Sequence, residues 1–97
     1  MQGVLIAFKV FDRLSSKKAV KFFRELYGYK DHSNNGKYTY HRKGLLDYIP
    51  HVKLVRGVII TTHDNFSKIT ELMEKFKVEY HVRDVILTEE DRKILSE

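Results

Sequence analysis

The segment over residues 3–11 constrains the fold more than any other, because its apolar residues fall on both faces of an extended strand. Leu5, Ala7 and Phe11 lie on one face by alternation. The other face carries Val4, Ile6, Phe8 and Val10. A strand with two apolar faces belongs at the centre of a sheet. The run is short, contains Lys9 and is not followed by a small-residue cleavage site, so we interpret it as a strand and not as a signal peptide.

Two further segments have the hydrophobic periodicity of amphipathic helices. The first covers Ser16–Tyr27, with Ser15 or Ser16 as its N-cap and Gly28 as the glycine that follows its C-terminus. The second covers residues 65–77, with Asp64 or Asn65 as its N-cap. Each helix has one apolar stripe, which predicts that both pack on the same face of one sheet.

Turn signals divide the rest of the chain into strands. Asn35-Gly36 favours a tight turn between residues 29–33 and 37–43, which predicts a β-hairpin. Residues 52–62 form a strongly apolar strand, with Arg56-Gly57 as a bulge or a close backbone approach. Residues 78–87 form the last strand, whose apolar pattern changes phase near Arg83-Asp84 and so predicts a bulge there. Thr88 then begins a short helix.

This order predicts an α+β fold of the ferredoxin-like, or split βαβ, type: an antiparallel sheet with two helices on one face, an extra β-hairpin and a short C-terminal helix. The order can be compared with that of the RNA-recognition motif, whose aromatic signatures lie on its first and third strands. The corresponding residues here are 5–10 and 56–60. The second stretch opens with the basic–glycine pair but lacks the aromatic residues after it, so we do not assign the chain to that motif.

The length of 97 residues predicts one domain over residues 1–97. The absence of cysteine excludes disulfides, thiolate metal sites and thiol catalysis. No run approaches the roughly 20 apolar residues that cross a bilayer, so we expect no membrane partner and a cytoplasmic location. The Lys- and Glu-rich composition is compatible with a thermophilic source. Two helices cover only one face of an apolar central strand, so the other face is left open. We therefore predict a homodimer that forms through this open face or through an edge strand.

The positive charge is concentrated in the first half of the chain. Residues 1–57 carry twelve Lys/Arg against four Asp/Glu, a net charge of +8, while residues 58–97 carry six against nine, a net charge of −3. Such an asymmetry indicates an anionic partner for the first half. The alternative is a lysine-rich surface that serves solubility alone.

Aromatic and basic residues alternate over residues 37–43. Alternation places Tyr38, Tyr40 and Arg42 on one face and Lys37, Thr39, His41 and Lys43 on the other. If the tyrosines face outward, they form a stacking platform for single-stranded RNA beside an arginine. If they face inward, which is the more ordinary role of tyrosine on a strand, they belong to the core. The opposite face presents positive charge in either case.

An enzymatic alternative depends on Asp12, which directly follows the first strand. Metal-dependent nucleases of this general topology, such as the CRISPR-associated Cas2 proteins, carry an acidic residue at this position, and a dimer brings two of them together over a phosphate. The simpler explanation is that Asp12 turns the chain and pairs with Arg13 or a nearby lysine. The five histidines lack the spacing of a zinc site, so no metal site and no cofactor are predicted.

The sequence therefore predicts a small basic protein that binds nucleic acid, RNA in preference to DNA, through phosphate charge and tyrosine stacking. The alternatives are a dimeric metal-dependent nuclease that uses Asp12 and a protein-interaction module that pairs through its open sheet face. An enzyme is the less favoured class. The residues expected at the nucleic-acid interface are Lys17, Lys21, Arg24, Lys37, Tyr38, Tyr40, His41, Arg42 and Lys43.

Overall fold

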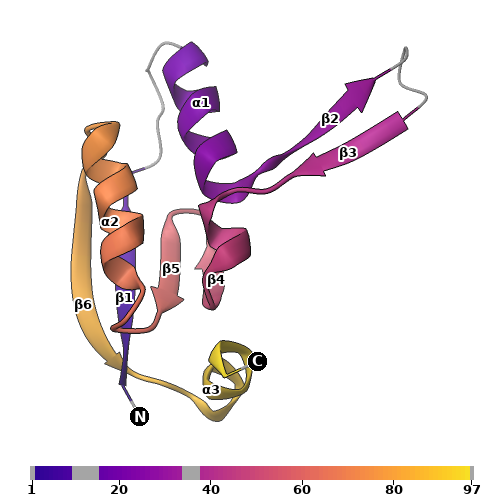
Figure 1. Ribbon diagram of the computed structural model, residues 1–97. Helices are drawn as coiled ribbons and strands as arrows, with labels where there is room; N and C mark the ends of the chain where they lie inside the picture. The colour runs from indigo at the N-terminus through magenta and orange to yellow at the C-terminus, as the bar shows by residue number, and fades with distance from the viewer. Residues whose placement is uncertain (1, 10–15, 34–37, 97) are drawn as a thin grey trace.

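The computed structural model describes residues 2–9, 16–33 and 38–96 and shows an α+β fold (Figure 1). The first half contains β1 (Gln2–Phe8), α1 (Ser16–Tyr27), β2 (Tyr29–Ser33), β3 (Tyr38–Arg42) and a 3-10 helix, η1 (Leu45–Tyr48). The second half contains β4 (His51–Val55), β5 (Val58–Thr61), α2 (Phe66–Lys75), β6 (Tyr80–Ile86) and α3 (Glu89–Leu95). No helix among the described residues is long and apolar enough to cross a membrane.

Four strands form an antiparallel sheet in the order β4-β5-β1-β6. β1 pairs with β5 on one side and with β6 on the other, which confirms the central position predicted from its apolar residues. Ile6 lies opposite Ile59 on β5 and Val82 on β6, and all three side chains point to the same face. A second sheet has two strands, β2 and β3.

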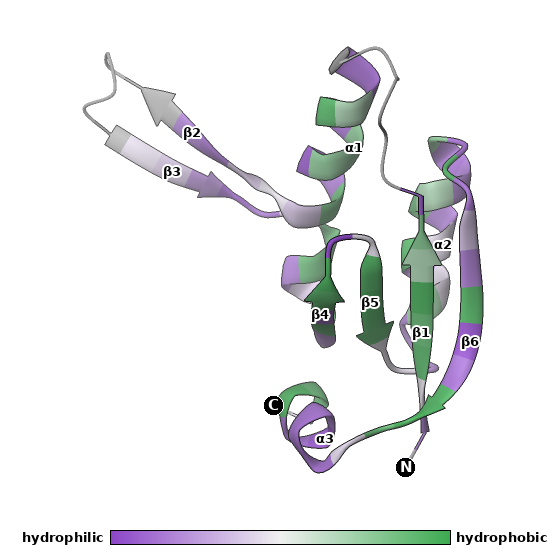
Figure 2. Ribbon diagram, turned by 180° about the vertical axis from the view of Figure 1, so that it is seen from behind, coloured by the Kyte–Doolittle hydropathy of each residue, from purple (hydrophilic) through white to green (hydrophobic). Residues whose placement is uncertain are grey.

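Helices α1 and α2 pack in one core cluster on the same face of the four-stranded sheet, and Figure 2 shows α2 behind β1. Phe22 of α1 and Met73 of α2 are fully buried in one cluster with Ile6 of β1. The rings of Phe22 and Phe76 meet edge to face at 5.5 Å, a favourable geometry for aromatic pairs. An ion pair of 3.0 Å between Lys75 and Glu25 joins the two helices at the surface. The predicted apolar stripes are therefore confirmed as a shared core.

The opposite face of the sheet is covered at one end by α3. Leu87 and Leu95 are buried there against Ile60, with Leu5 and Val85 packed around them. Thr88 is the N-cap of α3, and its hydroxyl accepts a hydrogen bond of 3.1 Å from the Asp91 N–H, as the sequence predicted.

The prediction of one strand over residues 52–62 is wrong, because the segment folds back on itself as β4 and β5. Val55 pairs with Val58, so Arg56 and Gly57 form a two-residue turn, the β4–β5 turn. Gly57 has a φ of +91°, in the left-handed region that glycine adopts most easily. A glycine within an apolar run is typical of both a bulge and a tight turn. The pairing of the apolar residues on either side of Arg56-Gly57 decides in favour of the turn.

The bulge predicted near Arg83-Asp84 is also wrong, since β6 pairs with β1 in continuous register from Tyr80 to Ile86. The apolar pattern changes phase because different helices cover the two faces of β6. Tyr80 and Val82 pack in the core under α1 and α2, whereas Val85 packs in the cluster with α3 on the other face.

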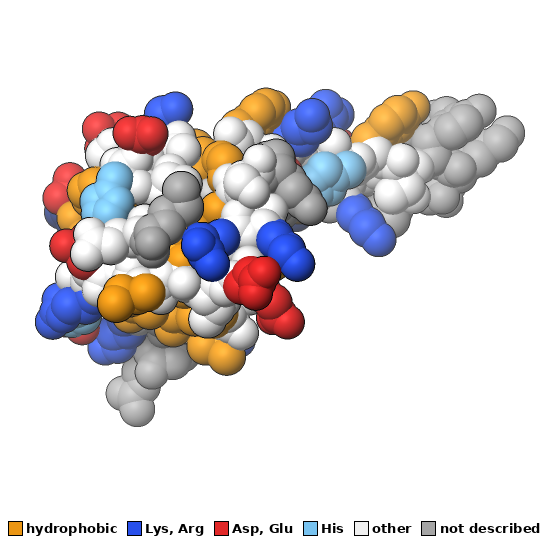
Figure 3. Space-filling view, turned by 90° about the horizontal axis from the view of Figure 1, so that it is seen from below, with side chains coloured by type: hydrophobic (Ala, Val, Ile, Leu, Met, Phe, Trp, Pro, Cys, Tyr) orange, Lys and Arg blue, Asp and Glu red, His pale blue; other side chains and the backbone are white. Residues whose placement is uncertain are grey.

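The predicted hairpin is confirmed, but it forms a projecting arm outside the main sheet. The arm consists of β2 and β3, which pair only with each other among the described strands. Figure 3 shows it extending from the body of the molecule. The whole molecule, with the arm, measures 47 × 30 × 20 Å. A two-stranded sheet with both faces uncovered is marginal by itself. Its base must therefore be held by contacts with the body.

Candidate functional site

Two glycines hold the base of the arm close to α1. Gly28 ends the helix with a φ of +81°, and its N–H donates a hydrogen bond of 2.9 Å to the Arg24 carbonyl. A Cβ on Gly44 would collide with the main-chain nitrogen of Gly28 and lie 2.6 Å from the carbonyl carbon of Tyr27. The two chain segments can approach this closely because neither glycine has a side chain.

Asp47 of η1 fixes the end of the arm. Its Oδ2 accepts a hydrogen bond of 2.8 Å from the Gly44 N–H and lies 3.2 Å from Nε2 of His41. The Gly44 N–H is the main reason that the pKa of Asp47 lies below its usual value, and the contact with His41 lowers this pKa further. His41 was expected to face a ligand. It instead contacts a carboxylate of its own chain.

The arm presents its tyrosine face to solvent and not to the core. Tyr40 is 52% exposed, so the core interpretation of this residue is wrong, because the arm is not covered by the main sheet. Arg42 shares that face and forms an ion pair of 3.2 Å with Asp31. Its charge is therefore partly neutralised. The side chain of Tyr38 lies outside the described part of the structure.

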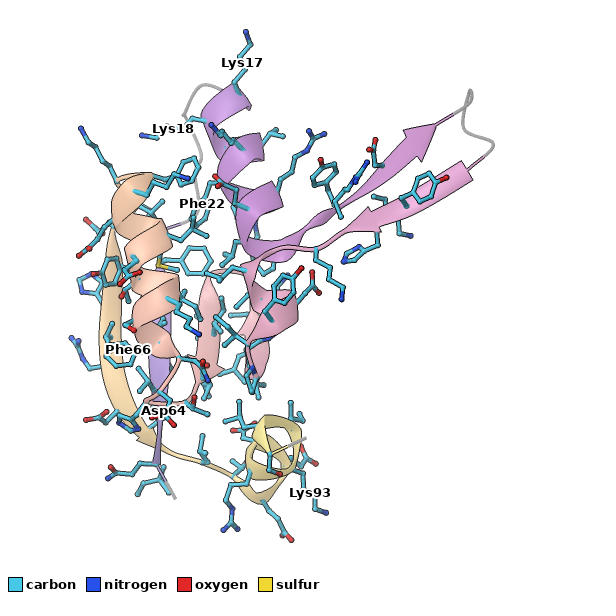
Figure 4. The ribbon with its side chains drawn as sticks, viewed as in Figure 1. Lys17, Lys18, Phe22, Asp64, Phe66 and Lys93 are labelled. Atoms are coloured by element: carbon cyan, nitrogen blue, oxygen red, sulfur yellow. The ribbon has the colours of Figure 1, made fainter. Side chains whose placement is uncertain are left out.

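The predicted basic stripe on α1 is exposed. Lys17, Lys21 and Arg24 all have solvent-accessible side chains, and Figure 4 shows Lys17 pointing away from the body at the free end of the helix. The guanidinium of Arg24 lies 4.4 Å from the centre of the Tyr29 ring. This cation–π contact connects the outer side of α1 to the first residue of the arm.

A groove that the sequence did not predict lies between α1 and the β4–β5 turn. It has a volume of about 620 Å³, and its lining includes Val20, Phe23, Arg24, Tyr27, Lys53 and Arg56. Lys53 Nζ lies 4.4 Å from the centre of the Tyr27 ring, and the Arg56 guanidinium lies 5.7 Å from that of Phe23. The fold thus brings two cations from β4 and its turn to Arg24 of α1.

Like Lys30 and Lys43, these three cations have no carboxylate partner among the described residues, whereas Arg42 of the arm does. The ion pairs of the described chain involve Lys75 and Arg42, and the rings of His41 and His63 each contact a carboxylate. Arg24, Lys53 and Arg56 each lie over an aromatic ring instead. A ring restrains a cation without cancelling its charge. The groove is therefore a fixed and strongly positive site.

Tyr27 forms part of the floor of the groove. The Phe23 and Tyr27 rings stack at 6.0 Å with an interplanar angle of 10°, and Lys53 covers Tyr27 as well. The Tyr27 hydroxyl is buried and has no hydrogen-bond partner in the described structure. Burial raises the pKa of this hydroxyl, and the nearby charge of Arg56 partly offsets the increase.

Other predicted site residues are not brought into the groove. Lys43 lies over the Tyr48 ring at 5.5 Å and lines a different depression, where Glu25 and Glu71 make the charge mixed. Asp12 and Lys37 lie outside the described residues, so the nuclease alternative stays a prediction. The described residues contain no cluster of three or more His, Asp or Glu side chains suited to a metal ion.

The apolar side chains of β1 do not provide a surface for a homodimer. Val4, Ile6 and Phe8 are buried under α1 and α2, and Val10 lies outside the described residues, so these side chains form no exposed patch. The exposed apolar side chains of β4 are Leu54, at 48%, and Val55, at 61%. The dimer stays a prediction that depends on these two residues.

No protein-family model, curated protein or solved structure matches this chain. A function has to be inferred from the groove and the arm themselves. The decisive features are the three cations of the groove, which have no carboxylate partner among the described residues, and their positions over aromatic rings.

Proposed function

We propose that this protein binds nucleic acid through phosphate contacts at the groove and along the outer stripe of α1. The observation that carries the proposal is that Arg24, Lys53 and Arg56 converge beside the groove without carboxylate partners in the described structure. Lys17 and Lys21 extend the positive surface along α1. RNA is the polymer that we expect, in line with the sequence.

The cation–π contacts favour binding of phosphate over a purely solubilising role. A free lysine or arginine loses side-chain freedom when it binds a phosphate, and this loss weakens binding. Lys53 and Arg56 are already restrained by the Tyr27 and Phe23 rings, so less freedom is lost on binding.

The arm has a secondary role in this proposal. Arg42 is paired with Asp31, so it contributes less to the electrostatic attraction than its formal charge suggests, and the ring of His41 contacts Asp47. Tyr40 is exposed on the arm and offers a ring on which a base can stack.

We also propose that the fold is a ferredoxin-like split βαβ fold with the arm inserted between α1 and β4. The order β4-β5-β1-β6 supports this assignment, because β5 pairs between β1 and β4, the two strands that α1 and the arm connect. The shared core of α1 and α2 on one face supports it too. Many unrelated functions occur on that fold, so it adds no weight to the functional proposal.

The proposal is tested by binding of a fluorescently labelled oligouridylate to the purified protein across a salt series. Five cations, the three of the groove with Lys17 and Lys21, each neutralise one phosphate at most. At about 0.7 per phosphate for a single strand, the slope of log K against log salt is expected to reach about −3.5. The absence of binding to single-stranded or duplex RNA and DNA, even at low salt, would reject a nucleic-acid function.

A further inference from the structure

We propose that the groove holds one unstacked nucleotide of a single strand, with its base in the apolar part and its phosphates on the cationic rim. This inference rests on the proposed function and specifies the form of the polymer. It also adds a base-contacting site between α1 and the β4–β5 turn to the exposed ring of Tyr40 on the arm.

The lining of the groove has two chemically different parts. Val20, which is 47% exposed, and the rings of Phe23 and Tyr27 provide the apolar part. Arg24, Lys53 and Arg56 provide the positive part, and none of the described residues that line the groove is acidic. A phosphate backbone alone would gain nothing from the apolar part. A nucleotide matches both, because it joins an apolar, flat base to an anionic phosphate.

Tyr27 is a floor for the base and not a stacking platform. Phe23 stacks against its ring and Lys53 lies over it, so this ring already has two partners within the chain. A base in the groove therefore contacts Val20 and can stack on the guanidinium planes of Arg24 and Arg56, a common mode for unpaired bases.

The size of the groove is sufficient for one nucleotide of an open strand. The volume of about 620 Å³ lies within the range of roughly 300–1,000 Å³ that is usual for small-ligand sites. In a duplex the faces of the bases are stacked on their neighbours, so only the phosphates would reach the groove. The groove is thus expected to prefer single strands, and the preference should come from the base.

The test compares a labelled oligouridylate with a strand of the same length and backbone whose central positions are abasic. The two ligands carry the same phosphates, so an affinity difference reports the base alone. A stacked base contributes enough to predict binding that is roughly 5- to 150-fold weaker for the abasic strand. Equal affinities would overturn the inference and leave the proposed function intact. No binding of either strand at low salt would reject the proposed function itself.

A protein variant locates the effect. Val20→Gln keeps the charge and changes an exposed position, so the fold should tolerate it while the apolar part of the groove loses its exposed aliphatic side chain. The ratio between intact and abasic strands should fall toward one. Ile86→Gln is the matched control, because Ile86 is 83% exposed on β6 and does not line the groove. An unchanged ratio in Val20→Gln would overturn the assignment to the groove.

Photocrosslinking gives an independent readout on the wild-type chain. A strand that contains 4-thiouridine should crosslink within the tryptic peptides over residues 22–24 and 25–30, which carry Phe23 and Tyr27. Crosslinks confined to the arm peptide that contains Tyr40 would place the base on the arm and overturn the inference.

Discussion

Replacing Gly44 by alanine tests whether the base of the arm is packed as tightly as the structure shows. Gly44 has a φ of −101° and a ψ of −179°, an extended conformation that alanine adopts freely. Without a close neighbour, Gly44→Ala should therefore stabilise the protein by about 0.4–1 kcal/mol, because it reduces the freedom of the unfolded chain. The sign of the change then depends on the contacts of the new methyl group.

That methyl group would collide with main-chain atoms that cannot rotate away. It would overlap the nitrogen of Gly28, and it would lie 2.6 Å from the Tyr27 carbonyl carbon and 2.7 Å from the Leu26 oxygen. Overpacking costs roughly 1–3 kcal/mol, and three overlaps with backbone place this site at the upper end. After the gain from the unfolded chain, we expect a net loss of about 2 kcal/mol.

The assay is thermal and urea unfolding of wild type and Gly44→Ala, followed by circular dichroism. A loss of about 2 kcal/mol corresponds to a midpoint lower by roughly 8–16 °C in a chain of this size. A variant that is as stable as the wild type, or more stable, would refute the close contact between Gly28 and Gly44. The position of the arm against α1 would then need another explanation.

Three further predictions concern single side chains. Tyr27→Phe removes a buried hydroxyl without a partner and should raise the free energy of unfolding by about 1 kcal/mol; a loss of stability would show that the hydroxyl is satisfied. The pKa of Asp47 is lowered in the folded state, so its contribution to stability is present at neutral pH and is lost as the pH falls below about 4. The stability difference between wild type and Asp47→Asn should therefore shrink on acidification, and a constant difference would contradict the Gly44 contact. If Leu54 and Val55 mediate a homodimer, Val55→Lys should halve the mass measured by light scattering, whereas a monomeric wild type would remove the prediction.

Local patterns predicted the elements whose identity depends on nearby residues. The bounds of α1 were predicted correctly because an apolar stripe and the terminal Gly28 lie within one helix. The two errors occurred where distant packing decides. Arg56-Gly57 became a turn because β4 and β5 pair with each other, and the phase change in β6 reflects α3 on the opposite face of the sheet.

In the candidate site, too, features within one helix were predicted, whereas features that need contacts between distant segments were not. The stripe of Lys17, Lys21 and Arg24 follows from helical spacing and was predicted. The groove was not, because Lys53 and Arg56 reach Arg24 only after β4 and its turn fold against α1. The sequence also did not show that the charge of Arg42 is neutralised by a carboxylate. Nothing local shows that Asp31 pairs with Arg42, eleven residues away.

The central claim is that the position of the groove cations, and not net charge, determines nucleic-acid binding. The most direct measurement compares Lys53→Gln/Arg56→Gln with the control Arg92→Gln/Lys93→Gln, which removes the same charge from α3. Figure 4 shows Lys93 at the end of the molecule opposite Lys17 and the start of α1. We predict that the groove variant binds a labelled oligouridylate more weakly, with a salt slope smaller by about 1.4, while the control keeps the slope of the wild type. Equal losses in the two variants would contradict the account.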